Sequence, residues 1–288
     1  MKNKLQNYKQ HIENYLETAC FVYPSEPQQI LFEAMRYSLL AGGKRLRPVF
    51  VFDFCNMCGG NWEDATTFAA ALEMIHTYSL IHDDLPCMDN DDYRRGMLTN
   101  HKKYGEATAV LAGDGLLTAA FHCLSKAPFS AEVRIKAVEV LAACAGELGM
   151  VGGQVLDMQS ETRQCTKEEV TAIQSRKTGA LIKAACVLGV IAGQGSAEQI
   201  AAAEIFASNI GLAFQIRDDM LDVIGNAEEL GKAVGVDTAK NTFVQLYGLD
   251  VCDQMVMNHT MSAIDALNVF PDHSFMEYLA NALTGRTN

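Results

Sequence analysis

The chain has 288 residues, nearly half of them apolar, and its 35 acidic and 23 basic residues give a formal charge of −12. This length allows a large buried core. The acidic balance argues against nucleic-acid binding and against an electrostatic membrane anchor, and the longest apolar runs, such as 186–192, are too short to span a bilayer. Nine scattered cysteines and the lack of a signal-peptide pattern lead us to expect a reducing, cytoplasmic location.

Apolar residues recur at three- and four-residue spacing along most of the chain, a pattern that predicts helices. The expected helices cover residues 4–20, 26–41, 46–58, 62–83, 107–126, 130–150, 167–190 and 196–226. Three capping-box pairs mark helix starts: Ser25 with Gln28, Thr166 with Glu169, and Ser196 with Gln199. Glycine pairs at 42–43, 59–60 and 152–153 predict breaks. We therefore predict an all-α fold, one large helical bundle over residues 1–288 that encloses a central apolar cavity.

A basic segment, Gly42-Gly43-Lys44-Arg45-Leu46-Arg47-Pro48, separates the second and third predicted helices. Glycines let a backbone approach a ligand closely, and Lys and Arg at a helix start suit phosphate oxygens. The segment is not a Walker loop, because Lys44 is followed by Arg rather than by Ser or Thr. An ordinary basic turn between helices is the alternative explanation.

The first acidic motif begins where the predicted helix 62–83 ends. Five aspartates lie within ten residues, at positions 83, 84, 89, 91 and 92, and Arg94 and Arg95 follow them. Clustered carboxylates repel one another unless a cation lies between them, and an oxygen-only ligand set favours Mg²⁺. Because Pro86 must loosen the helix, we expect Asp83 and Asp89 to face one ion. The alternative is a solvated acidic loop.

Three residues of the helix before this motif are candidates for the site. His76 precedes Asp83 by seven residues, so the two share one stripe of the helix, although a neutral core histidine is the more usual explanation. Tyr78 lies ~7 Å down the helix axis from Asp83, where it would form the floor of a cavity below the acids. Ser79 lies one turn below Asp83.

A second acidic motif, Asp218-Asp219-Met220-Leu221-Asp222, lies in another apolar helical run. Asp218 and Asp222 are four residues apart, and Gln215 lies one turn before them, so these side chains share one helix face. Several carboxylates in an apolar helix are costly unless a cation pairs with them. Three further residues fit an anion site: Lys177 with Thr178 in a helical run, and Lys232 in a glycine-flanked loop. Lys240 is a weaker candidate.

These motifs together resemble the trans-prenyltransferases of the polyprenyl synthetase family, and most closely its bacterial farnesyl diphosphate synthases. The resemblance covers nearly the whole chain and becomes loose beyond about residue 245. It is based on the order and spacing of the Gly-Gly-Lys-Arg-Leu-Arg-Pro segment, the D-D-x-x-x-x-D motif with its two arginines, the Lys-Thr pair and the second D-D-x-x-D motif. The spacing around Lys240 departs from the family pattern.

The resemblance implies an isoprenoid-synthase fold and a Mg²⁺-dependent head-to-tail condensation of isopentenyl diphosphate with dimethylallyl and then geranyl diphosphate. It also implies three Mg²⁺ ions per site, replaceable by Mn²⁺, and a homodimer. The implied metal ligands are Asp83, Asp89, Asp218 and Asp222, supported by Asp84 and Asp219. The implied contacts of the allylic diphosphate are Arg94, Lys177 and Lys232, and those of isopentenyl diphosphate are Lys44, Arg47, His76 and Arg95. Thr178 and Gln215 are expected to line the reacting centre.

The product implied by the resemblance depends on Tyr78 and Ser79, since a bulky aromatic five residues before the first motif tends to stop elongation at fifteen carbons in this family. Farnesyl diphosphate is therefore the expected product, with geranylgeranyl or geranyl diphosphate as alternatives. A terpene cyclase would lack the second diphosphate site, and a non-catalytic subunit would be expected to lack one acidic motif. A calcium-binding protein fits the composition, but Tyr93 and Arg94 break the EF-hand pattern.

Overall fold

The computed structural model describes residues 1–229 and 241–285. Tertiary contacts divide the chain into two compact units: residues 1–139 with 191–194, and residues 140–190 with 195–288. The prediction that residues 1–288 form a single domain stays a prediction.

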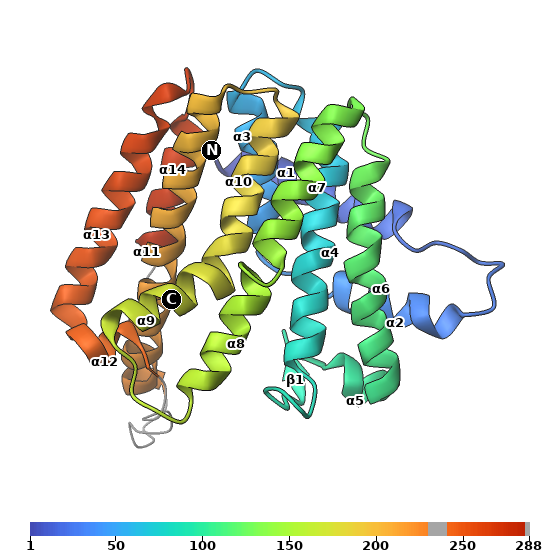
Figure 1. Cartoon of the computed structure of the whole chain (residues 1–288), viewed down its shortest axis with the longest axis horizontal. Helices are drawn as coiled ribbons and strands as arrows, with labels where there is room; N and C mark the ends of the chain where they lie inside the picture. Colours follow the sequence, from blue (N-terminus) through green and yellow to red (C-terminus); the bar gives the residue numbers. More distant parts are fainter. Residues whose placement is uncertain (230–240, 286–288) are drawn as a thin grey trace. The chain divides into compact units, whose positions relative to one another are not determined.

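The first unit is built around α4 (Thr66–Asp83), which contacts four neighbouring helices and runs beside α6 (Figure 1). Residues on all sides of α4 are buried, which explains why this segment is apolar throughout rather than along one stripe. Helix α1, by contrast, buries Tyr8, Ile12 and Leu16 at four-residue spacing. The elements of this unit are α1 (Lys2–Ala19), α2 (Gln29–Leu39), α3 (Leu46–Met57), η1 (Trp62–Ala65), α4, β1 (Tyr93–Arg94), β2 (Met97–Leu98), α5 (Asn100–Tyr104), α6 (Glu106–Ser125) and the first part of α7 (Ala131–Ala145).

The second unit is built around α11 (Ala197–Glu229), which packs along α13 (Leu249–Ala266) (Figure 1). A buried cluster joins Val170 and Ile173 to Ile216, Met220 and the fully buried Phe243. The remaining elements are α8 (Met150–Ser160), α9 (Lys167–Gln174), the π-helical turn η2 (Ser175–Gly179), α10 (Ala180–Ala192), α12 (Phe243–Tyr247), η3 (Leu267–Val269) and α14 (Ser274–Thr284).

Most of the predicted helices are present, and two of the three capping boxes are confirmed. Thr166 and Glu169 make both reciprocal bonds, as do Ser196 and Gln199. The third prediction was wrong, because α2 begins only at Gln29 and has no side-chain cap at its start.

The predicted break at Gly152 and Gly153 was also wrong, because both residues lie inside α8. Gly153 has a packing role instead: a Cβ there would lie 2.3 Å from the backbone nitrogen of Lys177. The sequence pattern also missed a short antiparallel hairpin, β1 with β2, whose turn places Arg95 and Gly96 at positive φ.

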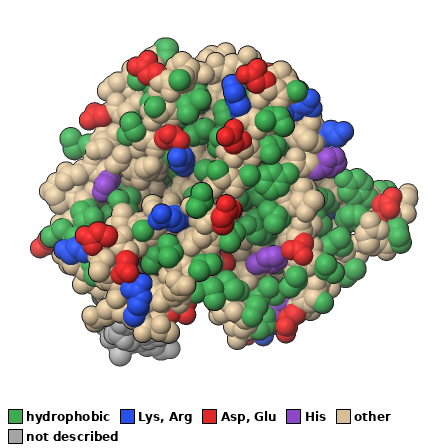
Figure 2. All heavy atoms as spheres, viewed as in Figure 1, with side chains coloured by type: hydrophobic (Ala, Val, Ile, Leu, Met, Phe, Trp, Pro, Cys, Tyr) green, Lys and Arg blue, Asp and Glu red, His purple; other side chains and the backbone are tan. Residues whose placement is uncertain are grey.

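Charged side chains are spread over the viewed face of the molecule. Figure 2 shows Lys and Arg side chains scattered among acidic and apolar ones over the described residues of this face, rather than gathered into a basic patch.

Candidate active site

The first acidic motif lies at the end of α4, as predicted. The helix ends at Asp83, and the chain then turns through Pro86 and the exposed Cys87. The backbone N–H of Asp89 donates to the Asp83 carbonyl at 2.8 Å. This bond brings the two residues together, although six positions separate them on the chain. Asp89 is exposed and Asp83 is partly exposed, so this loop presents carboxylates to solvent.

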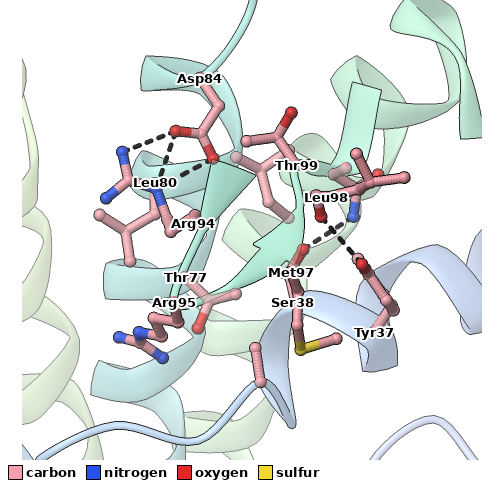
Figure 3. Close-up of a pocket in the computed structure, with 13 residues that line it drawn as sticks. Tyr37, Ser38, Thr77, Leu80, Asp84, Arg94, Arg95, Met97, Leu98 and Thr99 are labelled. Carbon is pink, nitrogen blue, oxygen red and sulfur yellow. Dashed lines mark hydrogen bonds and ion pairs between the residues drawn. The ribbon is translucent and has the colours of Figure 1, made fainter. Parts of the chain in front are cut away.

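Asp84 has a different environment from its neighbours. It is 3% exposed, and its carboxylate accepts from Arg94 Nε at 2.7 and 3.0 Å and pairs with Arg94 Nη2 at 2.6 Å (Figure 3). Burial raises the pKa of Asp84, and the Arg94 hydrogen bond opposes that shift. In this geometry Asp84 holds Arg94 in place, which agrees with its expected supporting role.

Arg94 and Arg95 are adjacent but reach different partners, because Arg94 ends β1 and Arg95 lies in the hairpin turn at positive φ. Arg94 turns toward Asp84, and Arg95 turns away from it (Figure 3). The guanidinium of Arg95 donates to the Gly42 carbonyl. It also lies close to Gly43, since a Cβ added to Gly43 would be 3.0 Å from Arg95 Cζ. The two arginines and Asp84 line a small pocket with Thr77 (Figure 3).

The basic segment and His76 meet in the first unit, as the sequence suggested. Lys44 is exposed, whereas Arg47 has a buried Nε with no hydrogen-bond partner among the described residues. Burial lowers the pKa of His76 well below 6.5, and the nearby guanidiniums of Arg47 and Arg95 lower it further. His76 is therefore neutral near pH 7, where its imidazole can donate one hydrogen bond and accept another.

The two residues predicted to set product length, Tyr78 and Ser79, differ in how far they are exposed. Tyr78 is 7% exposed and packs edge-on against His82, with ring centroids 5.7 Å apart. Burial, and then the Asp83 charge, raises the pKa of Tyr78. Ser79 is partly exposed and donates to the His76 carbonyl at 2.9 Å.

The second acidic motif lies on α11, and its three aspartates divide between two environments. Asp218 is partly exposed and Asp222 is exposed, whereas Asp219 is 8% exposed. The Asp219 carboxylate accepts from the backbone N–H of Phe243 at 2.8 Å and from Gln215 Nε2 at 3.4 Å. Burial raises its pKa and the Phe243 hydrogen bond opposes the shift. Asp219 thus anchors the start of α12, whereas Asp218 and Asp222 are more exposed.

Thr178 and Lys177 lie in the same unit, in the π-helical turn η2. The Thr178 hydroxyl donates to Gln215 Oε1 at 3.5 Å, so these two expected neighbours are brought together. Lys177 Nζ pairs with Asp157 Oδ2 on α8 at 2.5 Å. A π-helical turn widens a helix locally and is frequent at functional sites.

The donor set of both motifs fits Mg²⁺. Among residues 1–229 and 241–285, no three His, Cys, Asp or Glu side chains converge on one metal-sized position. Mg²⁺ does not require such a cage, since it usually keeps waters and binds one or two carboxylates together with substrate phosphates. The partly exposed Asp83 and the exposed Asp89 are compatible with this mode of binding, as are Asp218 and Asp222. Lys232 and Lys240 lie outside the described residues.

Comparison with known proteins agrees with this assembly of acids and cations. The family model for polyprenyl synthetase matches residues 28–268. This chain belongs to the polyprenyl synthetase family. It is 50% identical over 242 residues to the farnesyl diphosphate synthase of Micrococcus luteus, with 83% of each chain covered.

Two further relatives of this polyprenyl synthetase extend the comparison. It is 47% identical to the large subunit 1 of a chloroplastic heterodimeric geranylgeranyl pyrophosphate synthase of Arabidopsis thaliana, over 89% of this chain and 71% of the relative. A solved apo structure of an FPP/GFPP synthase from Zymomonas mobilis matches with a TM-score of 0.88 and 36% identity, over 98% of each chain. The predicted all-helical isoprenoid-synthase fold and the predicted family are confirmed.

One helix of this polyprenyl synthetase has the length and apolarity of a membrane span. It is α6, and a third of the qualifying window is buried. Within residues 1–229 and 241–285 no other helix meets this criterion, and α6 packs along α4, α2 and α5.

Sequence analysis missed two acidic residues that contact site cations. Glu73, on α4, is 3% exposed and pairs with the buried Arg45. Asp157 pairs with Lys177. A signal for Glu73 was present in the sequence, since a single acid within the apolar run 65–75 must be paired if the helix is buried.

Proposed function

We propose that this protein condenses isopentenyl diphosphate head to tail with dimethylallyl diphosphate, and then with geranyl diphosphate, to give farnesyl diphosphate. The observation that carries the proposal is membership of the polyprenyl synthetase family over residues 28–268. The residues expected from the resemblance are present in this chain in the family's order.

The proposed metal ligands are Asp83, Asp89, Asp218 and Asp222, which would hold three Mg²⁺ ions with Mn²⁺ as a substitute. Bound Mg²⁺ would neutralise the diphosphate oxygens and the charge that develops on the leaving group. Support comes from the exposure of Asp89 and Asp222 and the partial exposure of Asp83 and Asp218. Their neighbours Asp84 and Asp219 are buried and accept hydrogen bonds from the protein.

Fixed cations supply the remaining contacts of the allylic diphosphate. Arg94 is held by Asp84, and Lys177 is held by Asp157, so both reach the substrate already oriented. Lys232 is proposed as a third contact. Thr178 and Gln215, which are hydrogen-bonded to each other, are proposed to line the reacting carbon.

The diphosphate of isopentenyl diphosphate is assigned to Lys44, Arg47, His76 and Arg95. His76 contributes as a neutral hydrogen-bond donor, because the surrounding guanidiniums and burial keep it unprotonated near pH 7. The double bond of isopentenyl diphosphate would attack the allylic carbon as the leaving group departs. The condensed product would then lose a proton to pyrophosphate, which completes the step. An apolar cavity would keep water from the carbocation.

Product length is assigned to Tyr78. Its ring is buried in α4, five residues before Asp83, which corresponds to ~7 Å along the helix. Each added methylene gains ~0.8 kcal/mol when buried, so a chain grows until the cavity floor blocks it. Geranylgeranyl diphosphate is the second candidate product, because one relative at 47% identity is a geranylgeranyl pyrophosphate synthase subunit.

We also propose that the protein is a homodimer and that it is located in the cytoplasm.

A product assay tests this proposal. Purified protein is incubated with labelled isopentenyl diphosphate and dimethylallyl diphosphate, with Mg²⁺ or with EDTA, and chain length is read after dephosphorylation. A fifteen-carbon alcohol that forms only with Mg²⁺ is the expected result. A twenty-carbon alcohol would retain the reaction and refute the role of Tyr78. No product with any allylic starter would refute the proposed function.

A further inference from the structure

The cations assigned to isopentenyl diphosphate surround one buried acid, Glu73. Arg45 is 4% exposed; its Nη1 donates to Glu73 Oε2 at 3.1 Å, and its Nη2 donates to the Leu39 carbonyl at 2.8 Å. These bonds join three elements of the first unit: the basic segment before α3, helix α4 and the end of α2. Glu73 is therefore the fixed point to which the basic segment is attached.

The backbone at Arg45 shows how this attachment acts on its neighbours. Arg45 precedes α3 with φ 51° and ψ 35°, a left-handed conformation that costs energy in a residue with a side chain. Arg45 turns inward, Lys44 before it is exposed, and Arg47 lies in the first turn of α3. Loss of Glu73 would remove the buried carboxylate that pairs with Arg45 and leave it with the Leu39 carbonyl and the more exposed Glu13.

The negative charge of Glu73 also affects the pKa values of two other guanidiniums, those of Arg47 and Arg95. Burial lowers the pKa of Arg47 and of Arg95, and in both cases the Glu73 carboxylate is the largest influence in the opposite direction. The guanidiniums of Arg45, Arg47 and Arg95 thus share the buried Glu73 carboxylate, and the partly exposed Glu13 lies 3.8 Å from Arg45 Nε. Positive charge remains in excess, and this excess suits a diphosphate.

An unpartnered nitrogen points to the same conclusion. The Nε of Arg47 is buried and has no hydrogen-bond partner among the described residues, whereas the Nε of Arg45 lies 3.8 Å from Glu13. Buried donors without partners are rare in folded proteins, and an anion brought in by a substrate would reduce this cost.

We propose that Glu73 is a positioning residue for the diphosphate of isopentenyl diphosphate: it holds Arg45 and thereby sets the geometry of Lys44, Arg47 and Arg95. This inference rests on the proposed function, which assigns those three cations to that substrate. Glu73 itself does not touch the substrate, since its carboxylate is buried against Arg45.

Three variants test the proposal. Glu73→Gln removes the charge with little change in shape. Arg45→Met combined with Glu73→Gln removes both partners of the buried pair, which avoids an unpaired buried charge. Asp53→Asn is the matched control, because Asp53 is 1% exposed, lies on α3 and pairs with Lys4 at 2.5 Å. The readouts are the dissociation constant of isopentenyl diphosphate by calorimetry, KM for each substrate, kcat and the melting temperature.

The expected result separates positioning from stability. Glu73→Gln should weaken isopentenyl diphosphate binding about 10- to 100-fold, the range typical of residues that orient ligand-binding groups, while KM for the allylic substrate changes less than about threefold. The double variant should regain melting temperature and keep the weakened binding. Asp53→Asn should lower the melting temperature without this loss of binding.

Two results would overturn the proposal. One is unchanged binding of isopentenyl diphosphate in Glu73→Gln; the other is recovery of binding together with stability in the double variant, which would make Glu73 a purely structural partner of Arg45. If Glu73→Gln does not fold, the binding of isopentenyl diphosphate to the double variant alone decides between a positioning role and a purely structural role for Glu73. Calorimetric binding needs no turnover, so a wild-type protein that makes no product would refute the proposed function and leave the role of Glu73 to be judged on binding.

Discussion

Gly153→Ala is the substitution for which the structure makes the sharpest prediction. The new Cβ would lie 2.3 Å from the backbone nitrogen of Lys177 and 2.8 Å from the carbonyl carbon of Arg176. An ordinary contact begins at 3.4 Å, so η2 must move roughly 1 Å from α8. Both nearest neighbours are backbone atoms, and no side chain can rotate away to relieve the clash.

The magnitude follows from two opposing effects. Overpacking a tight contact costs about 1–3 kcal/mol of folding free energy, and Ala regains roughly 0.5–1 kcal/mol over Gly within a helix. A net loss of about 0–2.5 kcal/mol of folding free energy is expected. The effect on catalysis should be larger, because a misplacement of about 1 Å in a positioned group costs on the order of 100-fold in rate.

The assay compares Gly153→Ala with Gly179→Ala, which lies in η2 itself. A Cβ on Gly179 would meet only the Gln174 carbonyl, at an ordinary 3.5 Å. Steady-state condensation gives kcat, and denaturant unfolding gives stability. Gly153→Ala should lose about 100-fold in kcat and Gly179→Ala less than about threefold. Equal kcat in the two variants would refute the reasoning that close packing of α8 on η2 positions Lys177.

Three further outcomes are expected. Asp83→Ala or Asp218→Ala should lower turnover by orders of magnitude with an unchanged circular-dichroism spectrum, and near-wild-type turnover in either would remove that residue from the metal site. Tyr78→Ala should shift the products to longer chains while Ser79→Ala retains C15, as read by chromatography; an unchanged profile in Tyr78→Ala would place the cavity floor elsewhere. Because the pKa of folded His76 lies below its unfolded value of 6.5, the protein should lose stability as pH falls below 6.5 and His76→Gln should lose less; equal losses by thermal unfolding would contradict this.

The helices before Asp83 could be predicted from the sequence because their signals are local. Apolar spacing identified α4, and the position of Pro86 correctly indicated that the helix ends at the first acidic motif. The approach of Asp89 to Asp83 also follows from chain geometry over a few residues.

Features set by distant partners could not be predicted in this way. Gly153 was interpreted as a break, but its reason is the backbone of Lys177, 24 positions away on the chain. The pairings of Glu73 with Arg45 and of Asp157 with Lys177 likewise join residues that no local period connects. The C-terminal helices α13 and α14 were not predicted, since the resemblance weakens beyond residue 245.

The exposure of Cys87 gives the first acidic motif a natural chemical handle. Of the nine cysteines, all within the described part of the chain, Cys87 alone is exposed. Burial raises the pKa of several others, to about 12 for Cys20 and Cys55, and thiols react as thiolates. A maleimide fluorophore should therefore label Cys87 first, without mutagenesis. The dye would sit between Asp83 and Asp89, where its emission would report metal and diphosphate binding in real time.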